Sequence, residues 1–196
     1  MNPYFATNHL AAVLLLTTVS AWGMMELSQR SQPQRQGATK IGGGRDRIVF
    51  LACLVASAVV INLAPHVIPA AAIRPGAVAF TAGLLILLAG LVLRGWSFKT
   101  LDQYFTHTVQ VSADQPVIAT GPYRLLRHPS YAAVLLACIG AGLASANWAG
   151  LAGVLLLVLA PLLWRIHVEE RALLATLGDR YRAYAAQHKR LVPLIW

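Results

Sequence analysis

The fold of this chain is decided by two polar segments, Gly121-Pro-Tyr-Arg-Leu-Leu-Arg-His-Pro-Ser-Tyr131 and Arg165-Ile-His-Val-Glu-Glu-Arg171, and by the apolar run that separates them. That run extends from Ala132 to Trp164 and is interrupted by Ser145-Ala-Asn147. Its length of about 33 residues is twice that of a short membrane span, which predicts two helices folded back at the interruption. The hairpin returns the second polar segment to the membrane face where the first lies. We therefore expect Arg, His, Tyr and Glu side chains of both segments to meet in one site.

The composition is that of an integral membrane protein. Of the 196 residues, 57% are hydrophobic and 12% are charged, whereas soluble domains carry about 25% charged residues. The net charge is +9. The basic residues that produce it sort by membrane side, as described below, so we expect no nucleic-acid partner. Cys53 and Cys138 lie in apolar runs without metal-ligand spacing, so we expect packing residues and no metal site.

The hydropathy pattern predicts one all-α membrane domain over residues 1–196 with five transmembrane helices. The expected spans cover about residues 9–27, 48–64, 76–93, 131–145 and 147–164. Pro65 and Pro69 are expected to end the second helix. The first apolar run has no preceding basic residue, so we do not expect it to be a cleaved signal peptide. It is expected to remain as a span.

Three segments lie outside these spans. Residues 28–47 combine cations with Gln and Gly, a composition typical of a loop. Val109–Val117 lacks helical periodicity and is expected to be a loop or a short extended piece. From His167 to about His188, apolar and tyrosine residues recur at helical steps, which predicts an amphipathic helix lying against the membrane face.

The cations sort by membrane side. Fifteen of the 16 Lys and Arg residues lie in the loop after the first span, in residues 94–127 and from Arg165 onward, whereas Arg74 lies between the second and third spans. Five spans put the first three regions on one side, so the N-terminus is expected outside and the C-terminus in the cytoplasm. Both polar segments then face the cytoplasm.

Ionisable residues at the span ends allow two interpretations. Cations there commonly anchor a span at the interface, and this interpretation covers Arg94, Lys99, Arg127 and Lys189. Carboxylates gain nothing from anionic headgroups, so Glu169 and Glu170 indicate a polar pocket that holds a ligand. The alternative for Glu169 is an exposed ion pair with Arg165, worth a few tenths of a kcal/mol.

His128 precedes Pro129 and is therefore expected to be the last loop residue before the fourth span. Free N–H groups at that helix N-terminus suit an anion or a cofactor that carries a carboxylate. Tyr123 and Tyr131 flank this histidine, which favours a binding surface over a structural histidine.

These motifs closely resemble the isoprenylcysteine carboxyl methyltransferase family. The resemblance rests on residues 121–131, the apolar hairpin, Arg165-x3-Glu-Glu-x2-Leu-x4-Gly-x2-Tyr-x2-Tyr over residues 165–184, and Lys-Arg-Leu-Val-Pro at 189–193. It extends back to residues 94–110, and the first three spans match only in character. It implies a membrane methyltransferase that takes S-adenosylmethionine from the cytosol and a lipophilic or prenylated substrate from the bilayer. The enzyme would lie among the lipids of a bacterial cell membrane or a eukaryotic endoplasmic reticulum.

The resemblance also implies site residues. The cytoplasmic loop and the amphipathic helix would form the cofactor pocket, and Arg165 would be the catalytic residue that binds and positions the substrate. The implied cofactor-binding residues are Gln110, Gln115, Pro116, Val117, Ile118, Tyr123, His128, Pro129, Ser130, Tyr131 and Glu169. Methyl transfer from a sulfonium needs alignment of two bound molecules and exclusion of water, without a metal. A carboxylate acceptor needs no general base, and Arg165 could hold it through two parallel bonds.

Three alternatives stay open. Relatives in the same superfamily methylate phospholipid amines or small thiols, and Glu170 or His167 would then have to accept a proton. A membrane reductase resembling the steroid reductases would use NADPH instead. A non-enzymatic membrane component would use the polar segments as anchors only.

Overall fold

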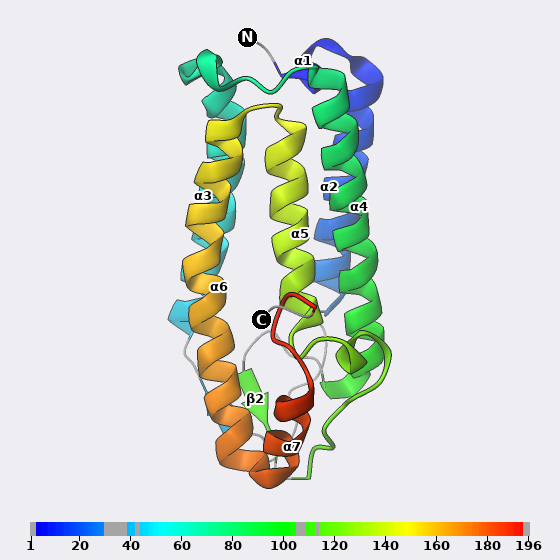
Figure 1. Cartoon of the computed structure of the whole chain (residues 1–196), viewed down its shortest axis with the longest axis vertical. Coiled ribbons are helices and arrows are strands. Elements are labelled where there is room, and N and C mark those ends of the chain that lie inside the picture. The colour runs from blue at the N-terminus through cyan, green and yellow to red at the C-terminus, as the bar shows by residue number, and fades with distance from the viewer. Residues whose placement is uncertain (1–2, 30–38, 42–43, 105–108, 113, 194–196) are drawn as a thin grey trace.

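The computed structural model describes residues 3–29, 39–41, 44–104, 109–112 and 114–193. Five long helices run side by side along the longest axis of the molecule (Figure 1). They are α2 (His9–Gln29), α3 (Gly44–Val67), α4 (Gly76–Leu101), α5 (Pro129–Ala144) and α6 (Trp148–Leu177). The short helices are α1 (Tyr4–Thr7), α7 (Asp179–Gln187) and the 3-10 turns η1 (Pro69–Ala71), η2 (Asp102–Tyr104) and η3 (Gly121–Arg124). Strands β1 (Thr39–Ile41) and β2 (Val109–Val111) form one antiparallel pair, so Val109–Val111 is extended as expected.

The long helices are those of a multi-pass membrane protein. Within the described residues, three helical stretches are long and apolar enough to cross a membrane: His9–Ser28, Gly76–Leu101 and Trp148–Leu177. Two further apolar stretches, Leu51–Val67 and Pro129–Ala144, are shorter. The outer faces remain apolar, with Val92 exposed by 70% and Leu156 by 77%, which suits contact with lipid tails. The expected count of five spans stays a prediction.

Helices α4 and α5 pack with their backbones in close contact. A Cβ atom added to Gly83 would lie 2.5 Å from the Gly140 carbonyl oxygen, and one added to Gly140 would lie 2.5 Å from the Leu87 nitrogen. Only glycine therefore fits at these two positions, as in many helix pairs within membranes. This contact sets the position of α5, whose first turn carries the site.

The hairpin between α5 and α6 turns at residues 145–147, as predicted. The Asn147 side chain caps α6 by accepting a hydrogen bond of 3.0 Å from the Gly150 N–H. Its amide nitrogen donates to the Ile68 carbonyl oxygen at 3.0 Å, which joins this turn to the end of α3. The buried Asn147 side chain thus starts α6 and holds the turn of the hairpin to the end of α3.

Two expected helix boundaries differ from the structure. Helix α6 continues without a break from Trp148 to Leu177, so residues 167–177 extend the fifth expected span instead of starting a separate helix. The break comes at Gly178, whose φ of 54° suits a glycine, and α7 begins at the next residue, Asp179. Helix α3 also continues through Pro65 and ends at Val67. It ends there because Pro69 disfavours helical geometry at the preceding residue, Ile68. The expected loop at 28–47 lies mostly in residues 30–38 and 42–43, outside the described residues; its ends belong to α2, β1 and α3.

Candidate active site

The hairpin brings the two polar segments together, as the sequence predicts. Tyr131 lies in the first turn of α5, and its hydroxyl donates a hydrogen bond of 2.7 Å to Oε2 of Glu169 on α6. The same hydroxyl accepts a hydrogen bond of 2.8 Å from Nε of Arg165, one turn earlier on α6. The Tyr131 hydroxyl therefore bridges the Arg165 guanidinium and the Glu169 carboxylate, and it links α5 to α6.

His128 precedes the first turn of α5, in the position expected from Pro129. The imidazole is 3% exposed and stacks on the Tyr131 ring, with the ring centroids 5.7 Å apart. Its Nε2 atom lies 3.2 Å from Oε1 of Glu170. The histidine is thus oriented from one side by a ring and from another by a carboxylate.

Glu170 is the centre of a buried ion cluster that the sequence did not predict. Glu170 is 6% exposed, and its carboxylate lies 2.8 Å from Nη1 of Arg127. Arg190 adds a pair of contacts, 3.0 Å from Nε and 2.9 Å from Nη2 to Oε2 of Glu170. Arg127 is therefore a partner in this cluster, not only an interface anchor as we expected. A carboxylate this deeply buried is stable because the cations balance its charge.

The segment after α7 closes over the start of α5. The N–H of Arg127 donates to the Lys189 carbonyl oxygen at 2.7 Å, and the N–H of His128 donates to the Arg190 carbonyl oxygen at 3.0 Å. These bonds place residues 189–190 beside residues 126–128, far apart in the sequence. Lys189, expected as an interface anchor, thus also contributes a backbone contact at the site.

Helix α7 is attached to the site through its tyrosines. The Tyr184 hydroxyl donates a hydrogen bond of 2.6 Å to the carbonyl oxygen of Tyr123. Burial raises the pKa of Tyr184 above its usual value, so this hydroxyl keeps its proton and remains a donor. Tyr181 is 3% exposed and packs beside Tyr184, with ring centroids 6.0 Å apart. The Gly-x2-Tyr-x2-Tyr motif therefore packs the end of the chain against the first polar segment.

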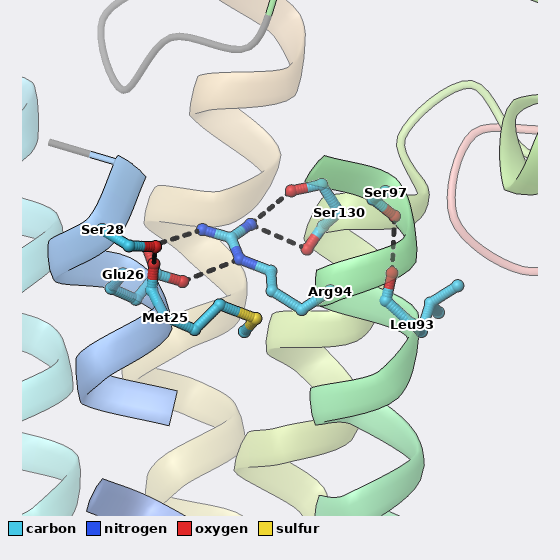
Figure 2. A network of polar contacts seen from close by, with 7 residues as sticks. All are labelled: Met25, Glu26, Ser28, Leu93, Arg94, Ser97 and Ser130. Atoms are coloured by element: carbon cyan, nitrogen blue, oxygen red, sulfur yellow. Dashed lines mark hydrogen bonds and ion pairs between the residues drawn. The ribbon is translucent and has the colours of Figure 1, made fainter. Parts of the chain in front are cut away.

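Arg94 is also buried, which corrects its interpretation as an interface anchor. It is 6% exposed, and Figure 2 shows its guanidinium between Glu26 of α2 and Ser130 of α5. Nε lies 2.8 Å from Oε1 of Glu26 and Nη2 lies 3.1 Å from Oε2. A carboxylate at the end of an apolar span, such as Glu26, was the signal in the sequence that could have indicated this pair. Lys99 is exposed, in agreement with an anchor.

A cavity of about 860 Å³ lies beside these groups. Its wall includes Arg165 and nine of the eleven expected cofactor-binding residues: Gln115, Pro116, Val117, Ile118, Tyr123, His128, Ser130, Tyr131 and Glu169. Pro129 is fully buried at the start of α5 and does not line the cavity. Gln110 pairs with Lys40 in the β1–β2 ladder, and its side chain lies outside what the structure describes.

The cavity is polar at one end and apolar along most of its length. Beyond the polar groups its wall is built from side chains of α2, α3, α5 and α6, among them Leu15, Leu54, Val134 and Val154, and it reaches His9 at the other end of α2. Among the described residues, no cluster of His, Cys, Asp and Glu could hold a metal ion. The arrangement suits a polar reactant beside a long apolar one.

The sequence of residues 82–175 matches the model of the isoprenylcysteine carboxyl methyltransferase (ICMT) family. Over these residues the chain is similar to the ICMT family. Arg94, Ser130, Tyr131, Arg165 and the Glu169–Glu170 pair all lie within them. The resemblance noted from the sequence motifs is thereby confirmed.

Relatives and a solved structure agree with the ICMT match. Protein-S-isoprenylcysteine O-methyltransferase A of Arabidopsis thaliana is 28% identical over 115 residues, which cover 58% of this chain and 58% of that protein. The enzyme of the same name from Tribolium castaneum is 31% identical over 115 residues, 58% of this chain and 41% of that protein. A structure of the eukaryotic intramembrane Ras methyltransferase ICMT superposes with a TM-score of 0.59 at 28% identity, over 74% of this chain and 52% of that chain. The chain thus spans about half the length of the relatives it matches.

Proposed function

We propose that this protein transfers a methyl group from S-adenosylmethionine to the carboxylate of a prenylcysteine-like acceptor at the cytoplasmic membrane face. The match to a methyltransferase family implies a methyl donor, and the relatives named above are isoprenylcysteine O-methyltransferases. The observation that carries the proposal is the Arg165–Tyr131–Glu169 chain of hydrogen bonds in the wall of the cavity. This chain places the Arg165 cation, which suits the carboxylate of the acceptor, next to the Glu169 anion, which suits the cationic methyl donor.

The residues at the polar end fit a cationic methyl donor. Glu169 offers a carboxylate that is oriented by the Tyr131 hydroxyl, and Ser130 and His128 add polar groups around the first turn of α5. The bound donor would supply an activated methyl group on a sulfonium, so the protein has only to align it and exclude water. Val117 and Tyr181 pack in one cluster and line the cavity, so they would close the site against solvent.

Arg165 would hold the acceptor carboxylate. Its guanidinium is always charged and can make two parallel bonds to a carboxylate without protonating it. The hydrogen bond to Tyr131 orients the side chain from Nε. A carboxylate held in this way is a nucleophile at neutral pH and needs no base.

The apolar length of the cavity suits a lipid tail. His9 and Glu26 both line it, and at about 1.5 Å per residue the stretch of α2 between them is about 26 Å long. The lipid tail of an acceptor would lie between α2, α3, α5 and α6, with the polar end of the acceptor beside Arg165. This arrangement supports a lipophilic acceptor over a small polar one.

An amine or thiol acceptor is the second candidate, and neither of the bases expected for it from the sequence, Glu170 and His167, suits that role. Glu170 is surrounded by Arg127, His128 and Arg190, which stabilise its ionised form and oppose proton uptake. His167 is exposed and does not line the cavity. The carboxylate acceptor is therefore the better fit to the described residues.

The proposal is tested with purified protein in detergent and in vesicles. S-adenosylhomocysteine should bind and raise the thermal stability of the protein, whereas NADPH should not. Labelled methyl groups should pass to an N-acetyl farnesylcysteine probe in vesicles of phosphatidylcholine. Binding of NADPH alone would support a reductase, and transfer to phosphatidylethanolamine alone would support an amine acceptor. Binding of neither S-adenosylhomocysteine nor NADPH would support a non-enzymatic component.

A further inference from the structure

The Arg94 side chain joins three helices at the polar end of the cavity (Figure 2). It belongs to α4, forms two contacts with the Glu26 carboxylate of α2, and reaches Ser130 of α5 from its Nη1 atom. Nη1 donates to the Ser130 carbonyl oxygen at 3.0 Å and also to the Ser130 hydroxyl. One guanidinium therefore connects the first expected span directly to the first turn of α5.

The environment of this guanidinium makes its position depend on Glu26. The Arg94 side chain is 7% exposed and lies against the Phe98 ring, 4.5 Å from the ring centroid. A charge this well shielded from water needs a partner, because its unpaired form is strongly destabilised. Glu26 provides that partner from a helix that otherwise contributes few polar groups to the site.

Ser130 is positioned between the two residues that shape the polar end of the cavity. Tyr131 follows it, and His128 is the residue before the helix begins. The carbonyl and hydroxyl of Ser130 both accept hydrogen bonds from Arg94, so the first turn of α5 is held in one rotation about its axis. That rotation determines where the Tyr131 hydroxyl meets Arg165 and Glu169.

We propose that Glu26 is a positioning residue for the active site: through Arg94 it holds Ser130, and thereby the Tyr131 hydroxyl, in the geometry that binds the methyl donor. Glu26 lies outside residues 82–175, so the ICMT match does not include it. The first span thus contributes a carboxylate to the polar end of the cavity, besides the apolar side chains that line its length. The inference rests on the proposed function in so far as the site that Glu26 positions is the methyl-transfer site.

The first test compares wild type with Glu26→Gln. Hydrogen exchange of backbone amides 131–134 in the ligand-free protein should become at least about tenfold faster, whereas exchange at 138–144 should not change. The affinity for S-adenosylhomocysteine, measured by calorimetry, should fall by about tenfold. The matched control is Thr18→Ala on the same helix, since the Thr18 hydroxyl bonds within α2, to the Leu14 carbonyl oxygen; both measurements should stay at their wild-type values.

A charge swap separates positioning from a merely structural ion pair. Glu26→Arg combined with Arg94→Glu keeps a pair of opposite charges, but a glutamate cannot donate to Ser130. The melting temperature of this double variant should therefore stay near that of wild type, while its affinity for S-adenosylhomocysteine should be low. Recovery of both together would overturn the inference, as would unchanged exchange at 131–134 in Glu26→Gln. A wild-type protein that does not bind S-adenosylhomocysteine would refute the proposed function, and the exchange measurement would still decide the role of Glu26.

Discussion

Tyr131 and Glu169, 38 positions apart in the chain, are joined by a hydrogen bond of 2.7 Å. The bond links the first turn of α5 to the part of α6 that continues past the expected membrane span. It exists because the hairpin at residues 145–147 returns the chain to the same end of the bundle. The predictions below concern this bond, its neighbours and the topology that would place it at the cytoplasmic face.

Tyr131→Phe removes the hydroxyl that bridges Arg165 and Glu169 and keeps the ring. Hydrogen bonds to charged groups contribute about 1.5–3 kcal/mol, so turnover per bound substrate should fall by about 10- to 150-fold. Steady-state methyl-transfer rates check this. Tyr4→Phe is the control, because the Tyr4 hydroxyl bonds with Asn8 at the opposite end of the bundle; its rates should equal those of wild type. Equal rates for both variants would show that the bridge has no role.

Glu169→Gln keeps the volume of the side chain and removes its charge. Binding of S-adenosylhomocysteine should weaken, because a neutral amide attracts a cofactor's positive groups less than a carboxylate does, while the helix content should not change. Isothermal calorimetry and circular dichroism provide the two readings. An affinity equal to that of wild type would leave Glu169 as a partner of Tyr131 only.

Arg165→Lys keeps the positive charge and loses the planar pair of donors. If Arg165 grips an acceptor carboxylate, the change should cost about 2–4 kcal/mol of transition-state stabilisation, or about 30- to 1000-fold in rate, with little effect on cofactor affinity. Turnover from pH 6 to 9 is measured for both proteins. Near-normal turnover of the variant, with wild-type activity that collapses below neutral pH, would indicate an amine or thiol acceptor and an essential base.

Glu170→Gln leaves Arg127, His128 and Arg190 without the carboxylate that balances them. Removing one member of a buried ion cluster leaves uncompensated charge, so the free energy of unfolding should fall by about 3 kcal/mol. Denaturant unfolding in detergent measures the loss. Asp179→Asn serves as control: its ion pair with Arg182 lies at the surface, where screening by water leaves little stability to lose. Equal stability of the two variants would contradict a structural role for the Glu170 cluster.

The predicted topology is tested by single cysteines at Ser31 and at Ala71, in a protein that carries Cys53→Ala and Cys138→Ala. The two positions should react with a membrane-impermeant thiol reagent from opposite sides, because the cation bias puts residues 28–47 in the cytoplasm and the turn after α3 outside. Labelling of intact cells and of inverted vesicles gives the sidedness. Labelling of both positions from one side would rule out the arrangement with five spans.

The sequence by itself determined the class of the fold, the hairpin and most of the polar residues that line one end of the cavity. Apolar runs of membrane length, a polar interruption at residues 145–147 and the order of the two polar segments require the segments to meet, whatever the detailed packing. Local rules also identified the start of α5, because a residue before proline avoids helical geometry. The ICMT motifs then indicated which side chains line the cavity, and most of those described do so.

Only the tertiary structure decided which charges are buried together. Arg94 and Arg127 have the sequence context of interface anchors, yet each is paired with a carboxylate, Glu26 at 68 positions and Glu170 at 43 positions along the chain. Such pairs depend on how α2, α4, α5 and α6 rotate about their axes, which is set by contacts such as the glycine packing of α4 on α5. Hydropathy reports which segments leave water, whereas the partner of a buried charge depends on distances that exist only after the helices have packed.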